Sequence, residues 1–233
     1  MSKYSWSKED ALRDASVEGQ QQQVLTLLQR GAMVNDASHG NTPLGHAAYK
    51  GHNQIVKTLI EHGAIVNLAR TGTGSTPLCA ASLNGHHLVV ETLLKHGANV
   101  NIARTDDGAT PLFQAALRDH HKIVLSLLKH GAIVDCATVF GETPLFEASR
   151  RGHHQVVETL LEHGATVDCA TIDGDTPLSI AILNGNEEVV NLLRYFTEPT
   201  SVHSVTMAMM MMKELWTYHE MECLSIIELF QMM

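Results

Sequence analysis

The feature that most constrains this sequence is a triplet, Thr-Pro-Leu, that recurs at almost constant spacing. The triplets begin at Thr42, Thr76, Thr110, Thr143 and Thr176, at intervals of 34, 34, 33 and 33 residues. A second signature, His-Gly-Ala, follows four of them at a constant distance and begins at His62, His96, His130 and His163. Such periods are typical of repeat proteins, in which each repeat is one supersecondary unit that stacks on its neighbours.

One period predicts two short helices joined by a tight turn. Thr42 suits the N-cap of the first helix, and Pro43 suits its first position, where the missing N–H costs nothing. Gly51 and Gly63 are placed to end the two helices at a positive φ. The second helix has one apolar stripe, made of Ile55, Val56, Leu59 and Ile60, and the stripe recurs in later periods. Since one such pair cannot bury its apolar face alone, the core must lie between stacked pairs.

This pattern resembles the ankyrin repeat, whose period is about 33 residues and whose signature contains Thr-Pro-Leu. The resemblance covers roughly residues 9–196. It implies an all-α solenoid of stacked helix-turn-helix units with short hairpin loops. We expect an N-terminal segment over 1–8, a degenerate cap repeat over 9–38, and then five repeats with Thr-Pro-Leu, the last incomplete.

Two departures from the family pattern stand out. The family has a histidine after Thr-Pro-Leu, where this chain has Gly45, Cys79, Phe113, Phe146 and Ser179. The Thr–His hydrogen bond at the helix start is therefore not expected. Asp119 replaces the glycine of the other inter-helix turns, and aspartate tolerates the left-handed region better than most residues.

The repeat register is lost after Phe196, and residues 197–233 are rich in methionine. Their length is about one repeat, so the favoured interpretation is a degenerate helical C-terminal cap. A flexible tail that is left exposed for a partner is the alternative. The loss of register also fits a fragment of a larger protein whose effector, enzymatic or membrane domain lies beyond residue 233.

Charge and composition exclude several classes of function. Lys and Arg number 16 against 25 Asp and Glu, a net charge of −9 that disfavours a nucleic-acid partner. No apolar run approaches the ~18–20 residues that cross a bilayer, and the N-terminus lacks the apolar core of a secretory signal. Four cysteines are too sparse for a disulfide scaffold. We expect a soluble, monomeric protein of the cytoplasm, with the nucleus as a second location.

The 15 histidines raise the question of a metal site. Equivalent histidines of stacked helices lie ~8–10 Å apart, whereas bonds to zinc are ~2.0–2.1 Å long. We therefore interpret His52, His86, His120 and His153 as structural residues of the inter-helix turns. His219 and Cys223, with His203 upstream, suggest a small-molecule or metal site in the tail as an alternative. No nucleophile–base pair or phosphate-binding loop is recognisable, so we expect no enzyme and no cofactor.

In the ankyrin family, partner proteins bind on the concave side, to the loop tips and the exposed face of each first helix. Carried over by position, this implies a partner-binding set of Tyr49, Arg70, Arg104, Asp106, Arg118, Phe140, Arg150, Arg151 and Ile172. Phe140 is the most specific of these, because polar residues stand at the equivalent positions of the other loops. The alternative is a tip that folds back over its own repeat.

Arg118, Arg150 and Arg151 form a cationic cluster in the neighbouring repeats. The default interpretation of such charges is a solvated face; the alternative is that this cluster, together with Phe140, suits an acidic or phosphorylated segment. Phe113 and Phe146 are expected to fill space beside the first helices instead of facing a ligand.

Three asparagines, Asn35, Asn67 and Asn101, follow Gly-Ala-x-Val and have a leucine eight residues before them. This resembles the context in which a cytosolic oxygenase hydroxylates asparagines of ankyrin repeats. The acidic residue that is often preferred two positions before the asparagine is absent here. The three asparagines are therefore candidate modification sites.

Overall fold

The computed structural model describes residues 7–197, which form an all-α fold with no strand in that range. Its helices are Lys8–Glu18 (α1), Gln21–Gln29 (α2), Pro43–Lys50 (α3), Asn53–Glu61 (α4), Pro77–Leu83 (α5), His87–Lys95 (α6), Pro111–Leu117 (α7), His121–Lys129 (α8), Pro144–Arg151 (α9), His154–Glu162 (α10), Pro177–Leu183 (α11) and Glu187–Thr197 (α12). They alternate as first and second members of helix pairs, as the repeat pattern predicts.

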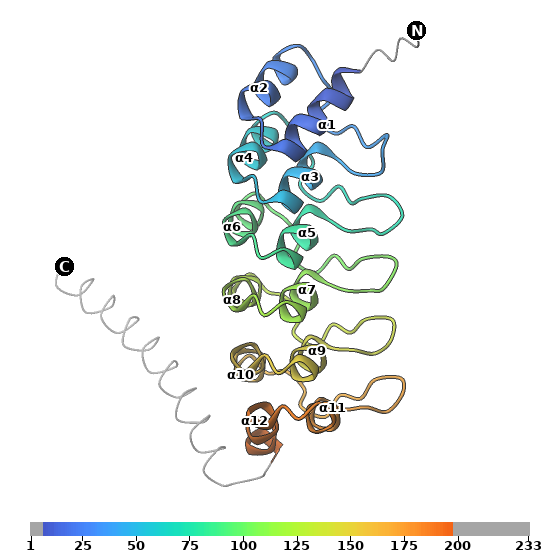
Figure 1. Cartoon of the computed structure of the whole chain (residues 1–233), viewed down its shortest axis with the longest axis vertical. Helices are drawn as coiled ribbons and strands as arrows, with labels where there is room; N and C mark the ends of the chain where they lie inside the picture. The colour runs from blue at the N-terminus through green and yellow to red at the C-terminus, as the bar shows by residue number, and fades with distance from the viewer. Residues whose placement is uncertain (1–6, 198–233) are drawn as a thin grey trace, which may run out of the picture. The chain divides into compact units, whose positions relative to one another are not determined.

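The helix pairs stack in two layers (Figure 1). First helices contact first helices along the row from α1 to α11, and second helices contact each other from α2 to α10. A loop precedes each first helix from α3 to α11 and projects from the first-helix layer, on the side away from the second helices. The described residues up to Leu192 belong to one compact unit; a second unit begins at Leu193, and within it the structure describes only the end of α12. The expected C-terminal cap lies, beyond Thr197, outside the described residues.

Every Thr-Pro-Leu triplet starts a first helix in the same way. The Thr42 hydroxyl accepts a hydrogen bond from the backbone N–H of Gly45 at 3.0 Å, and Thr110 does the same for Phe113 at 3.2 Å. Proline occupies the first turn each time. Because the threonine caps the backbone itself, the absence of the family's histidine leaves this bond intact.

The apolar stripe of the second helices is part of the core, as expected. Ile55, Val56 and Leu59 of α4 are buried, and so are their counterparts in later repeats. Phe113 and Phe146 are also buried, which confirms that they fill space beside the first helices.

Histidines of the inter-helix turns bond each repeat to the one before it. His52 Nε2 donates to the Val17 carbonyl at 3.0 Å, and His86 Nε2 donates to the Tyr49 carbonyl at 3.0 Å. His120 and His153 repeat the bond at 3.2 and 3.4 Å. The structural interpretation of these histidines is confirmed.

The three candidate asparagines have a similar role in the segments that follow the C-terminal ends of the second helices. Asn101 donates from Nδ2 to the Gly131 carbonyl at 3.1 Å and accepts the N–H of Ile133 at 2.9 Å. Asn35 and Asn67 make the corresponding pairs of bonds to the next repeat. Both ends of each amide are therefore engaged, and hydroxylation, which stays a prediction, would act on residues that join neighbouring repeats.

Candidate binding surface

The loops form one continuous row. The loops before α5, α7, α9 and α11 are each closed at the base by a backbone hydrogen bond, such as Arg70 N–H to Ser75 O at 2.9 Å. Each tip is also bonded to the preceding tip: Thr105 N–H donates to Thr73 O at 2.9 Å and Ile172 N–H to Phe140 O at 3.1 Å. These bonds hold the loops in place before any partner binds. We call the surface formed by the loops and the exposed sides of the first helices the loop face.

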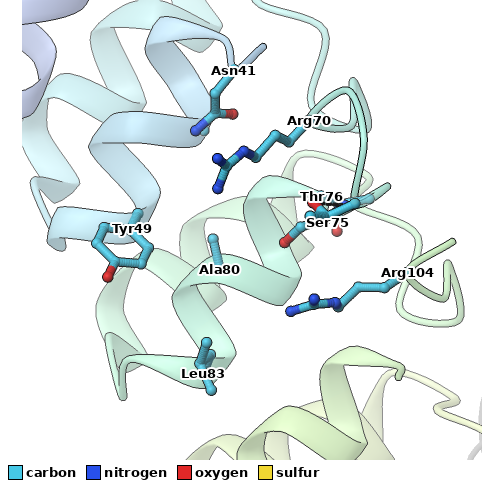
Figure 2. Close-up of a pocket in the computed structure, with 10 residues that line it drawn as sticks. Asn41, Tyr49, Arg70, Ser75, Thr76, Ala80, Leu83 and Arg104 are labelled. Carbon is cyan, nitrogen blue, oxygen red and sulfur yellow. Dashed lines mark hydrogen bonds between the residues drawn. The ribbon is translucent and has the colours of Figure 1, made fainter. Parts of the chain in front are cut away.

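The loop face is hollowed between α3 and α5 (Figure 2). The hollow has a volume of about 140 Å³ and is lined by Asn41, Gly45, Tyr49, Arg70, Thr73, Ser75, Thr76, Ala80, Leu83 and Arg104. It thus brings together Tyr49, Arg70 and Arg104, three residues of the predicted partner-binding set.

This space exists because two of the residues that line it, Ala80 and Gly45, are small. Ala80 is the fourth residue after its threonine, a position that is occupied by His46, Gln114 and Glu147 in other repeats. Gly45 leaves room for Asn41, since a Cβ there would lie 2.1 Å from Asn41 Oδ1. A comparison of the repeats at these two positions would have revealed the hollow from the sequence.

The two arginines of the hollow differ in their partners. Arg104 binds Asp106 through two bonds, Nε to Oδ1 at 3.0 Å and Nη2 to Oδ2 at 2.5 Å, and also pairs with Asp107. The hydrogen bonds to Asp106 raise the pKa of Arg104 and lower the pKa of the Asp106 carboxyl. Arg70 is exposed and has no ion pair among residues 7–197.

The arginines that the sequence predicts as a cationic cluster have a different role in the structure. Arg150 and Arg151 both pair with the carboxylate of Glu147, which is fully buried; Arg151 Nε lies 2.7 Å from Glu147 Oε1. The two arginines compensate a buried charge and are therefore not free cations, and Arg151 is needed by its own repeat. Arg118 stays exposed at the end of α7.

Phe140 is exposed to 55% at its loop tip and does not fold back over its repeat. Ile172 is exposed to 71%, and with Val139 these residues make an apolar patch on adjacent tips. No hydrogen bond, ion pair or ring contact joins the Phe140 side chain to the arginines in the described part of the chain. The structure thus does not bring the predicted set together: Tyr49, Arg70 and Arg104 line the hollow, and Phe140 and Ile172 lie at the apolar tips. The remaining members, Asp106, Arg118, Arg150 and Arg151, belong to neither group.

The second helices carry a wider and more open hollow of about 420 Å³, which the sequence did not indicate. Its lining residues are Lys57, Glu91, Thr92, Lys95, His96 and His130, which come from several repeats.

Residues 7–197 offer few groups for a catalytic or metal site. Cys79, Cys136 and Cys169 are free thiols, and burial raises the pKa of the Cys79 thiol. That range contains no group of three side chains that could hold a metal ion, and no helix there is long and apolar enough to cross a membrane. The alternative site at His203, His219 and Cys223 lies outside the described residues.

A family model described as ankyrin repeats (three copies) matches the chain in three stretches, residues 5–70, 65–138 and 133–202. Together these matches span every helix from α1 to α12, and they include all the loops described above. No curated protein matches the chain.

Proposed function

Because the chain belongs to the ankyrin-repeat family, we propose that it is an adaptor that recognises a partner protein through its loop face. Ankyrin repeats are generally protein–protein interaction modules. The observation that carries the proposal is the set of large side chains exposed on the loop face: Tyr49 on α3, and Phe140 and Ile172 on loop tips that are bonded into one row.

The mechanism is recognition by a preorganised surface. Loops that are already ordered lose little conformational freedom when a partner binds, so more of the contact energy appears as affinity. Such energy is concentrated in a few aromatic and arginine anchors near the centre of an interface. In this proposal the protein binds and does not catalyse.

The proposal includes a monomer located in the cytoplasm or nucleus. The sparse cysteines, four in 233 residues, support a reducing compartment, because disulfide scaffolds of oxidising compartments use many more. Fluorescence microscopy of a tagged full chain tests the location, and light scattering of the purified protein tests the monomeric state.

The test compares two double variants of the full chain in partner capture from cell lysate, followed by affinity measurement on the captured protein. Phe140→Ala with Ile172→Ala removes the apolar tips, and should weaken binding by about 2 kcal/mol or more. Lys122→Ala with Glu158→Ala alters exposed residues of second helices and should leave binding unchanged. Arg151 is avoided because its loss would disturb Glu147.

The reverse result, in which the second-helix pair weakens binding and the tip pair does not, would show that the partner binds elsewhere. Melting curves of both variants should match the parent protein, because all four side chains are exposed.

A further inference from the structure

We infer that the hollow between α3 and α5 binds an extended segment of a partner protein through a carboxylate, which pairs with Arg70. The inference rests on the proposed function and names the chemistry of what binds at one place on the loop face.

The loop of Arg104 shows what an arginine at this position can hold. Arg70 and Arg104 occupy equivalent places, since each closes its loop with a backbone bond, to Ser75 and to Ala109. Arg104 grips Asp106, two residues further on, with two parallel bonds. The loop of Arg70 has Gly72 at the corresponding position and no acidic residue. Arg70 therefore presents the same guanidinium group as Arg104, but its own loop has no carboxylate to accept the hydrogen bonds that Asp106 accepts in the next repeat.

The surroundings of Arg70 favour an anion. Figure 2 shows its guanidinium reaching from the loop toward Asn41 and Ala80, over the hollow. No acidic residue is among the ten that line the hollow. The Asn41 side chain uses its oxygen to accept the N–H of Thr42 at 3.0 Å, and its amide nitrogen has no acceptor among the described residues. An entering carboxylate would thus meet a cation and a neutral donor.

The size of the hollow fits a side chain. Its volume of about 140 Å³ corresponds to about four or five water molecules at ~30 Å³ each, enough for the end of an Asp or Glu side chain. Tyr49 and Leu83 supply apolar surface for the neighbouring parts of the segment. The continuous row of loops gives an extended chain a path on either side.

The experiment selects phage-displayed peptides of about 12 residues, which span about 40 Å when extended, on the full chain. We expect enrichment of Asp or Glu at one fixed position, next to an apolar residue. Affinities of the best peptide are then measured by fluorescence anisotropy. Arg70→Gln should weaken binding about tenfold or more. Ala80→Gln, which places the side chain of the next repeat in the hollow, should weaken it as much without a change of charge.

Lys122→Gln is the matched control, because it changes the net charge equally on an exposed position of α8 and should have no effect. Replacing the selected Asp or Glu of the peptide by Asn or Gln should reproduce the loss caused by Arg70→Gln. Amidation of the peptide's C-terminus removes the terminal carboxylate, and so shows whether that group or a side-chain carboxylate binds in the hollow.

Enriched peptides without an acidic position, or an acidic peptide that is insensitive to both Arg70→Gln and Ala80→Gln, would overturn the inference. If such peptides lose binding in the Phe140→Ala, Ile172→Ala variant, the proposed function still stands. A failure to enrich any peptide also overturns the inference, and the partner capture described above then judges the proposed function separately.

Discussion

At the scale of single residues, Glu147 is the least expected feature of the chain. A carboxylate that is fully buried is strongly unfavourable unless charged partners compensate it. Arg150 and Arg151 supply this compensation from three and four residues further along α9. The sequence shows the three charges and their helical spacing, but the burial that makes the pairing matter depends on packing against neighbouring repeats.

We predict that Arg151→Ala lowers the free energy of unfolding by about 1–2 kcal/mol, a reduced value for a pair whose arginine is partly exposed. In a Glu147→Gln background, where no buried charge needs a partner, the same change should cost much less. Urea unfolding of the four proteins gives the coupling free energy. Equal costs in both backgrounds would mean that Arg151 does not stabilise Glu147.

At the scale of the helix and its turns, most of the structure could be predicted because the signals are local. The capping threonines, the prolines and the glycines act within a few residues of themselves, and the helices begin and end where these residues stand. The bonds between loop tips could not be predicted, since they join backbone groups about one repeat apart whose side chains follow no pattern. The hollow can be predicted only by comparing the repeats position by position, because it depends on the side-chain atoms that Gly45 and Ala80 lack.

The inter-helix turn at Asp119 gives a test at this scale. Asp119 has a φ of 59°, where other turns have glycine. The histidine bond of the following repeat, from His153, is the longest of its row at 3.4 Å. We predict that Asp119→Gly raises the free energy of unfolding by about 0.5–1 kcal/mol, because glycine adopts a positive φ without strain.

The converse change, Gly85→Asp, should destabilise the protein by more than Asp119→Gly stabilises it. A Cβ at Gly85 would lie 2.6 Å from the His120 ring, so the side chain would be opposed both by the backbone and by the next repeat. Thermal melts of the two variants against the parent protein measure both effects. A gain in stability from Gly85→Asp would contradict this account of the turn.

At the scale of the whole molecule, the main helix–helix contacts of the described residues run between neighbouring repeats, so the ends of the stack determine how well the last repeat is covered. Ile182 and Leu183 of α11 are 52% and 77% exposed. The position of Ile182 holds Ala48, Ser82, Ala116 and Ser149 in the earlier repeats, all of them buried and small. A large apolar residue at this position suits a surface that a further element covers. We therefore propose that residues 198–233 act as the cap that the sequence suggests.

This proposal predicts that a chain ending at Thr197 melts about 4–8 °C lower than the full chain, if about 2 kcal/mol of apolar burial is lost.

The change Ile182→Ser restores the residue type of the preceding repeat and distinguishes the two interpretations of the tail, as a cap or as a segment that covers nothing. In the full chain, Ile182→Ser should be destabilising, because it removes apolar surface that the cap buries. In the shortened chain it should be neutral for stability and should reduce aggregation, because Ile182 would then face water. Calorimetry and light scattering on the four proteins measure both quantities. If shortening the chain leaves the melting temperature and the solubility unchanged, residues 198–233 do not cover α11, and the alternative of a tail exposed to a partner gains support.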